Sequence, residues 1–247
     1  LDLSKKGQIR KLIDTNDDGY PDKSIVFADS LTLPMGLMRW KKGILVADSP
    51  NILYFEDTDG DQKADKREVV LTGFSLSNPQ HNMNTPKFGL DNWIYLGHSG
   101  AIKSFTYEDI FGDKGKEITF PNKPNAAFLP KNGNGRNVRF KPDSYQVESL
   151  SGETQYGHTT DPWGRRFYTD NANHLFHEVI DARYVNANKN LVIADAMEKI
   201  PDHGNACEIY PISENPNHQL LTDVGVVTSS CGITWYDGGA FGEKYNK

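Results

Sequence analysis

The stretch that decides the fold reads IRKLIDTNDDGYPDKSIV over Ile9–Val26, and a similar stretch, ILYFEDTDGDQKADKREV, covers Ile52–Val69. Both contain an apolar start, an Asp-Thr pair, further aspartates, and an Asp-Lys pair before a second apolar segment. The second copy begins 43 residues after the first. A repeat of about 40 to 50 residues built from short strands is typical of propeller blades. We therefore expect an all-β protein with the β-propeller fold.

Further strand, turn and strand units follow the same pattern of alternating apolar residues around turn residues. We expect such units at 33–48, 85–97 and 157–170, an opening strand at Gly232–Tyr236, and another unit within Arg183–Ser213. Residues 114–139 are rich in Gly, Asn, Pro and Lys and predict a long surface insertion. Short helical turns are expected at Glu108–Phe111 and Ile180–Asn188. Residues 1–247 would form one incomplete propeller domain, a fragment of a longer chain.

Composition and charge restrict the kinds of partner. The 247 residues carry a formal net charge of -6, which argues against nucleic acid or an anionic membrane as the main partner. No apolar run reaches the roughly 18 residues of a membrane span. Cys207 and Cys231 are too few for a disulfide scaffold. They would either form one disulfide or be small buried residues, and burial is the favoured alternative.

Two aspartate-rich loops predict cation sites. In Asp14–Asp22 and Asp57–Asp65, oxygen-bearing side chains alternate around a glycine, as calcium ligands do in tight loops. The alternative is an aspartate-rich turn that is held by Asx hydrogen bonds without metal. In either case we expect the loops to stabilise the hairpins. The expected ligands are Asp14, Asn16, Asp18, Asp22, Asp57, Asp59, Asp61 and Asp65.

A polar loop with a histidine precedes the unit at 85–97 and is the first candidate site. Loops held by rigid strands commonly present binding or catalytic residues, so His81 is the candidate catalytic residue. The alternative is that His81 only caps strand ends. His158, the second candidate catalytic residue, enters the next unit in a similar way, and superposed blades would bring both histidines to one face. Gln80 and Arg136 are the candidate cofactor-binding residues.

Scattered histidines and arginines give a weaker signal. His81, His158, His174 and His203 have neighbouring polar residues, but their spacing matches no compact metal motif. We expect them to be hydrogen-bonding residues rather than ligands of zinc or iron. No nucleophile elbow, P-loop or dinucleotide fingerprint is present.

Several motifs resemble one known family along nearly the whole chain. They include Asp57–Asp61, Asn78–His81, Gly89–Tyr95, Asp161–Gly164, Ile200–Gly204 and Ser230–Thr234. The chain resembles the membrane-bound dehydrogenase family of planctomycetes, verrucomicrobia and Bacteroidetes. That family in turn is similar to soluble glucose and sorbosone dehydrogenases and is often fused to a cytochrome c domain.

The resemblance implies a six-bladed propeller and pyrroloquinoline quinone as cofactor. It also implies that His81, which precedes Gly89-Leu90-Asp91, is the general base for oxidation of a sugar or polyol. Haem c would belong to a cytochrome domain outside this chain, and the location would be the periplasm or cell surface. The alternatives are a non-catalytic propeller that binds carbohydrate or protein within a polysaccharide-utilisation complex, and a cofactor-free propeller lyase or hydrolase.

Overall fold

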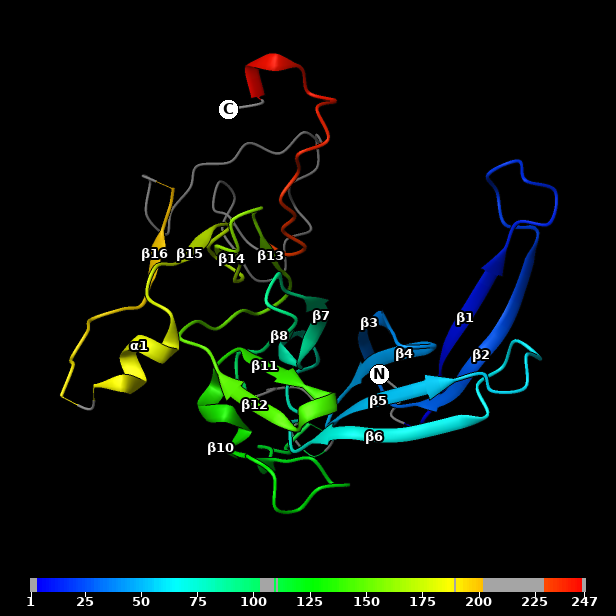
Figure 1. The fold of residues 1–247 in the computed structure, drawn as a ribbon, viewed down its shortest axis with the longest axis horizontal. Coiled ribbons are helices and arrows are strands. Elements are labelled where there is room, and N and C mark those ends of the chain that lie inside the picture. Colours follow the sequence, from blue (N-terminus) through cyan, green and yellow to red (C-terminus); the bar gives the residue numbers. More distant parts are fainter. Residues whose placement is uncertain (1–3, 103–108, 110, 189, 202–228, 246–247) are drawn as a thin grey trace. The chain divides into compact units, whose positions relative to one another are not determined.

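The computed structural model of this chain describes residues 4–102, 109, 111–188, 190–201 and 229–245 (Figure 1). The described residues form several antiparallel sheets with little helix, which confirms the all-β class. The chain divides into two compact units, Leu1–Gln155 and Tyr156–Lys247. Among the described residues, every helix is too short or too polar to cross a bilayer.

The repeated stretches fold as two hairpins with loops of the same length. Strand β1 (Gly7–Ile13) pairs with β2 (Lys23–Leu31), and β5 (Asn51–Glu56) pairs with β6 (Lys66–Thr72). The last pair before the loop is Ile13 with Lys23 in the first hairpin and Glu56 with Lys66 in the second. The predicted correspondence between the two copies is therefore confirmed at the level of register.

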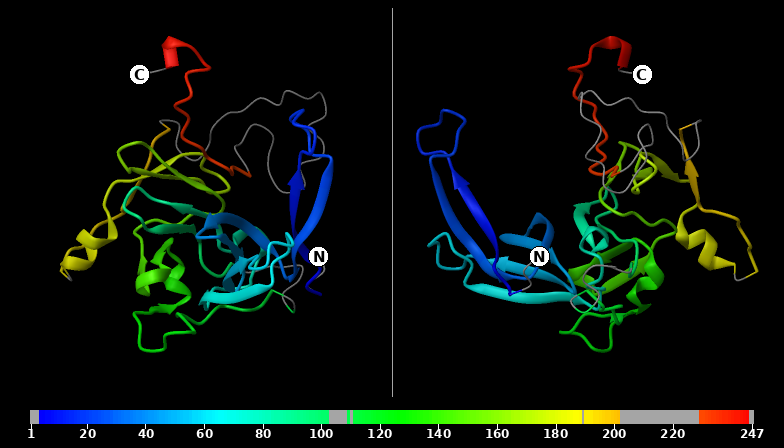
Figure 2. Two further views of the ribbon diagram at one scale, coloured as in Figure 1. Left: turned by 45° about the vertical axis from the view of Figure 1, so that its right-hand side comes forward. Right: turned by 180° about the vertical axis from the view of Figure 1, so that it is seen from behind.

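The first four-stranded sheet has the order β3-β4-β5-β6, in which β3 is Pro34–Trp40 and β4 is Gly43–Asp48. The unit expected at 33–48 is thus confirmed. Alternate residues of a strand face opposite sides of the sheet. Accordingly Ile52 and Tyr54 join the main core, whereas Leu53 and Phe55 pack beside Ala28 and Leu31 of β2. The tip of the β1–β2 hairpin extends beyond this contact (Figure 2).

A second sheet of the first unit contains the hairpin expected at 85–97. Its order is β7 (Asn84–Phe88), β8 (Ile94–Gly97), β11 (Val138–Lys141) and β12 (Gln146–Ser149). Between β8 and β11, the short strands β9 (Glu117–Ile118) and β10 (Leu129–Lys131) form a two-stranded sheet.

The segment 114–139 differs from the surface insertion that we expected. Ile118, Phe120, Leu129 and Val138 are buried in the main core of the first unit. Residues 121–125 form an exposed turn, but Asn132, Gly133 and Asn137 are buried, and the apolar residues bury enough surface to hold the segment against the sheets. Residues 138 and 139 belong to β11 itself.

The second unit has one four-stranded sheet and a short helix. Its strands β13 (His158–Thr160), β14 (Arg166–Tyr168), β15 (Phe176–Glu178) and β16 (Met197–Lys199) pair in sequence order. The hairpin expected at 157–170 is confirmed. Helix α1 (Ala182–Ala187) confirms the helical turn expected at 180–188, and Asp181 caps it by accepting a hydrogen bond from the Arg183 backbone N–H. This unit also has a 3₁₀ turn at Glu243–Tyr245, whereas the 3₁₀ turns at Pro79–His81, Asn132–Gly135 and Pro142–Ser144 belong to the first unit.

Other expectations on the C-terminal part were wrong or lie outside the described residues. Gly232–Tyr236 is not a strand. The Trp235 N–H donates to the Thr159 side chain at 2.9 Å, so a side-chain contact replaces a strand ladder there. Cys231 is exposed and free, which contradicts its expected burial. Some expected features lie outside the described residues. They are Cys207, His203, residues 202–213 of the unit expected within 183–213, and two residues of the turn expected at 108–111.

Candidate functional site

The turn that carries His81 is organised by Asn78 and Pro79. The Asn78 side chain accepts a hydrogen bond from the Gln80 backbone N–H at 3.1 Å, and the His81 N–H donates to the Asn78 carbonyl at 2.9 Å. Proline at the first position fits a 3₁₀ turn because its φ is already restricted. The turn leaves Gln80 exposed and His81 half-buried.

The His81 ring is held at one nitrogen only. Nδ1 lies 3.2 Å from the Ser99 hydroxyl, which follows the end of β8. Nε2 makes no hydrogen bond to any residue that the structure describes. Burial lowers the pKa of His81, because the charged imidazolium loses solvation. The ring is therefore neutral at neutral pH, and Nε2 can accept a proton.

A buried layer of asparagines lies directly after His81. Asn82 accepts a hydrogen bond from the Ser77 N–H at 3.3 Å, and Asn84 donates to the Asn82 carbonyl at 3.0 Å and to the Gln155 carbonyl at 2.8 Å. The Nδ2 atom of Asn82 is buried and has no partner among the described residues. An unpaired buried donor costs roughly 1–3 kcal/mol. A ligand oxygen or a water at this position would remove that cost.

His98 is a site residue that the sequence analysis missed. It is fully buried, and its Nδ1 and Nε2 lie 3.0 Å from the Arg136 carbonyl and 3.1 Å from the Asn132 side-chain oxygen. Burial lowers the pKa of His98 and outweighs these two hydrogen bonds, which favour the charged form. The signal available in the sequence was the polar run Gly97–Gly100 directly after an apolar strand.

Two predicted residues, His81 and Arg136, both contact the segment His98–Ser99. His81 contacts Ser99, and the neighbouring His98 contacts the Arg136 carbonyl. One nitrogen of the exposed Arg136 guanidinium donates to the Ser151 carbonyl at 2.6 Å. Arginine has five N–H donors, so this bond anchors the group and leaves donors for an anionic or carbonyl ligand.

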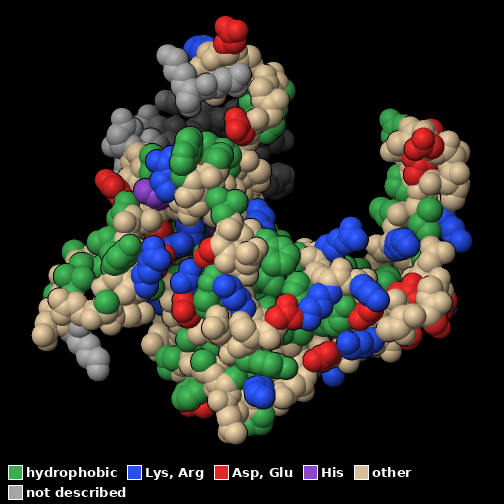
Figure 3. Space-filling view, in the orientation of Figure 1, with side chains coloured by type: hydrophobic (Ala, Val, Ile, Leu, Met, Phe, Trp, Pro, Cys, Tyr) green, Lys and Arg blue, Asp and Glu red, His purple; other side chains and the backbone are tan. Residues whose placement is uncertain are grey.

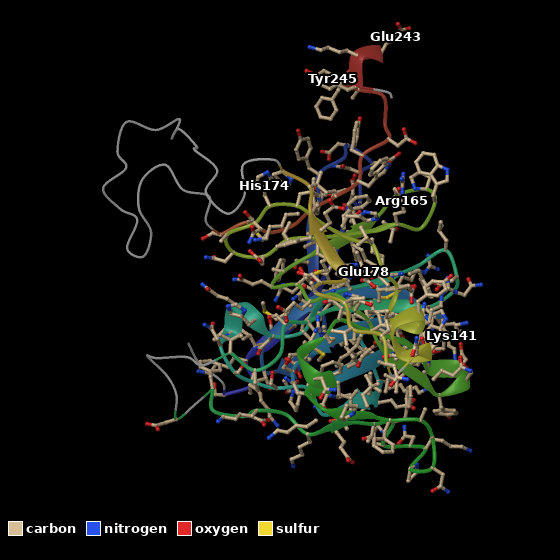
Figure 4. The ribbon with its side chains drawn as sticks, turned by 90° about the vertical axis from the view of Figure 1, so that its left-hand side faces the viewer. Lys141, Arg165, His174, Glu178, Glu243 and Tyr245 are labelled. Atoms are coloured by element: carbon tan, nitrogen blue, oxygen red, sulfur yellow. The ribbon has the colours of Figure 1, made fainter. Side chains whose placement is uncertain are left out.

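His158 lies in the second unit and is buried at the start of β13, where its backbone pairs with Tyr168. Its expected position beside His81 stays a prediction. His174 is exposed in the turn before β15, whereas Glu178 is buried at the end of that strand (Figure 4). Glu178 pairs with Arg166 at 2.6 Å and accepts a hydrogen bond from the Tyr168 hydroxyl.

The second aspartate loop gathers three carboxylates. Oxygen atoms of Asp57, Asp59 and Asp61 lie within 4.8 Å of one another. Asp65 accepts hydrogen bonds from the Thr58 N–H at 2.9 Å and the Thr58 hydroxyl at 2.5 Å, and these bonds lower its pKa. The loop is thus closed by Asp65 and carries a cluster of negative charge at its tip.

The first aspartate loop has the same internal bonds. Asp14 accepts backbone hydrogen bonds from Asn16, Asp17 and Gly19, and Asp22 accepts from Thr15. These bonds lower the pKa of Asp14 and of Asp22. Both loops therefore contain the Asx bonds of the metal-free alternative, and among the described residues only the second loop also brings three carboxylates together.

Comparisons with known proteins identify a family for this chain, but the description of that family names no activity. No curated protein and no solved structure matches the chain. A family model described as a domain of unknown function, DUF7133, matches residues 2–247. Because the match covers nearly the whole sequence, the chain belongs to the DUF7133 family.

Proposed function

We propose that this chain oxidises a hydroxyl group of a sugar or polyol and that His81 is the general base. One observation carries the proposal: the half-buried imidazole is held through Nδ1 by Ser99, while Nε2 has no hydrogen-bond partner in the described part of the chain and can accept a proton. A base works best when its proton acceptor is oriented and uncharged at the working pH. The lowered pKa of His81 keeps the ring uncharged at neutral pH.

The residues around His81 suit a flat ligand rich in oxygen acceptors, such as pyrroloquinoline quinone. Donors lie on the chain segments that surround His81: exposed Gln80, the guanidinium of Arg136, and the amide of Asn82, which lacks a partner among the residues that the structure describes. When bound, the quinone supplies the two-electron acceptor for such an oxidation. His81 would take the hydroxyl proton at Nε2, and Ser99 would keep the ring in the orientation needed.

The arrangement of strands within the sheets supports a propeller architecture. We propose that the four-stranded sheets, each a meander of consecutive strands apart from the β9–β10 insertion, are blades of a propeller. We also propose that calcium occupies the aspartate loops as a structural ion and that the protein acts in the periplasm or at the cell surface. A cytochrome domain outside this chain would be the natural electron acceptor.

Reconstitution tests the proposed function. The chain is incubated with pyrroloquinoline quinone and calcium, and dye reduction is followed with a panel of aldoses and polyols. We expect turnover that His81→Ala lowers by about 100-fold or more, since general bases contribute on the order of 10²–10⁴. The matched control is His174→Ala, which removes an exposed histidine and should change the rate less than about twofold.

Two results would contradict the proposal. Turnover that survives His81→Ala would show that another group is the base. Absence of turnover across the whole panel, with the quinone shown to be bound, would favour the non-catalytic binding module or the cofactor-free enzyme.

A further inference from the structure

A cavity of about 500 Å³ lies in the first unit, over one face of the β3–β6 sheet. This volume is within the range of small-molecule sites. Residues two apart on a strand face the same side of the sheet, so alternate residues of neighbouring strands can form the floor of the cavity. The floor is formed by Tyr54 and Glu56 of β5 and by Lys66, Glu68 and Val70 of β6. The walls come from other segments of the same unit, namely Trp40–Lys42, Phe120, Asn122, Pro142, Asp143 and Tyr145.

Four aromatic side chains give the cavity its apolar surface. Trp40 and Tyr54 meet edge to face, with ring centroids 5.0 Å apart and planes at 85°. Phe120 and Tyr145 meet in the same way at 5.6 Å and 88°. Edge-to-face pairs hold rings in defined orientations. Trp40 is partly exposed, and the ammonium of exposed Lys41 lies 4.2 Å from its ring centroid in a cation–π contact, which a ligand that packs on this face would displace.

Two carboxylates on the floor are held in place by neighbouring groups. Lys66 Nζ lies 3.8 Å from a carboxylate oxygen of Glu56 and 3.8 Å from one of Glu68. The Tyr54 hydroxyl donates to Glu56 at 2.9 Å, and Asn122 donates to Glu68 at 2.8 Å. An ionised carboxylate has about four acceptor positions. Acceptor positions therefore remain for the hydroxyl groups of a ligand.

The charges that line the cavity are balanced. Three lysines, Lys41, Lys42 and Lys66, face three acids, Glu56, Glu68 and Asp143. Over β5 and β6 the two signs are interspersed and do not form a single-sign patch (Figure 3). A site for an anion or a cation would carry an excess of the opposite charge. Balanced donors and acceptors beside aromatic rings suit a neutral ligand that has many hydroxyl groups and an apolar C–H face.

We propose that this cavity binds a neutral saccharide whose pyranose ring packs on Trp40 or Tyr145 and whose hydroxyl groups hydrogen-bond to Glu56, Glu68 and Asn122. The residues of this binding site are distinct from His81, Ser99 and Arg136. The inference goes beyond the proposed oxidation and does not depend on it, because the site would retain a glycan whether or not the chain is catalytic.

Titration calorimetry with the intact chain tests the saccharide site. The probes are cellotetraose, xylotetraose, mannotetraose and maltotetraose, with tetragalacturonate as an anionic probe. We expect at least one neutral probe to bind with a Kd of about 1 mM or tighter. Trp40→Ala should weaken that binding by about tenfold or more, and Glu68→Gln by about threefold or more.

Two further variants separate loss of the site from loss of the fold. Tyr145→Asn removes a wall ring but keeps a residue that tolerates the left-handed backbone at this position, where φ is 53°. It should also weaken binding by about threefold or more while the melting temperature is unchanged. Trp163→Ala is the matched control. Trp163 is an exposed tryptophan of the second unit, and Arg165 lies 4.9 Å from its ring centroid, so it also has a cation over its ring. This variant should bind like the wild type.

The outcomes decide between the possibilities. Binding that is lost in the cavity variants, kept in Trp163→Ala and kept in His81→Ala supports a saccharide site separate from the proposed base. Binding that is unchanged by Trp40→Ala, Tyr145→Asn and Glu68→Gln overturns the assignment. The assignment is also overturned if the chain binds only tetragalacturonate or binds none of the five probes. Failure of dye reduction alone would contradict only the proposed oxidation.

Discussion

The Nδ1 atom of His81 lies 3.2 Å from the hydroxyl oxygen of Ser99, and among the described residues this is the only hydrogen bond that orients the ring. Ser99→Ala should leave the base in place but allow the ring to rotate, and small misplacements of a catalytic group lower the rate. We expect kcat for dye reduction to fall by about tenfold with KM nearly unchanged. Ser24→Ala, at an exposed position of β2, is the control. A wild-type kcat in Ser99→Ala would show that Ser99 does not orient the base.

The pH dependence of turnover should report the state of His81. Burial lowers the pKa of this ring, so the neutral base persists below the ordinary histidine pKa of about 6.5. We expect kcat/KM to be constant above pH 6.5 and to fall only at lower pH. A pH–rate profile measured with a saturating quinone checks this, and an acidic limb centred above pH 7 would contradict the assignment of the base.

The buried ring of His98 should make folding sensitive to acid. Its pKa is lowered in the folded state by burial, so the unfolded chain binds more protons between the folded pKa and about 6.5. The free energy of unfolding should therefore decrease as the pH falls below about 6.5. Urea denaturation at pH 7.5 and pH 5 should show a smaller decrease for His98→Gln than for the wild type. His174→Gln, an exposed change, should retain the full decrease.

The ion pair between Arg166 and Glu178 should contribute to the free energy of unfolding of the second unit. The Glu178 side chain is fully buried, accepts from Arg166 at 2.6 Å and also accepts from the Tyr168 hydroxyl. Breaking a buried pair costs about 3–5 kcal/mol when the remaining charge is uncompensated. Glu178→Gln leaves Arg166 with Asp181 at 3.1 Å as its carboxylate partner, so we expect a smaller cost of about 1–3 kcal/mol. Chemical denaturation measures the change. Exposed Glu198→Gln on β16 should cost less than about 0.5 kcal/mol, and an equal cost for both would contradict the prediction.

Calcium should stabilise the hairpin of β5 and β6. Asp57, Asp59 and Asp61 converge within 4.8 Å, and a cation would offset their repulsion. At about 100 times its Kd, a ligand that binds only the folded state adds about 2.7 kcal/mol. We expect calcium to raise the melting temperature of the wild type by several degrees and that of Asp59→Asn by much less. Asp29→Asn, outside the loops, should respond like the wild type; no response in the wild type would favour metal-free Asx turns.

The hairpins were predictable because their signals are local. The Asp-rich turns and the alternation of apolar residues define the two copies at Ile9–Val26 and Ile52–Val69, and their register agrees with that prediction. The strand expected at Gly232–Tyr236 failed because strand propensity alone supplies no partner, and the Trp235 N–H is bonded to a side chain instead. The buried residues of 114–139 were missed because Gly, Asn and Pro dominate the local composition.

The sequence by itself determined the all-β class, the hairpin boundaries and the choice of His81, since these depend on turn chemistry and on residues close together in the chain. Only the tertiary structure decided that His98 is buried against Asn132 and Arg136, which lie 34 and 38 residues further along. It also decided that Trp40, Glu68 and Tyr145 line one cavity. Contacts between distant segments depend on how the sheets pack, and no local pattern of residues specifies that packing.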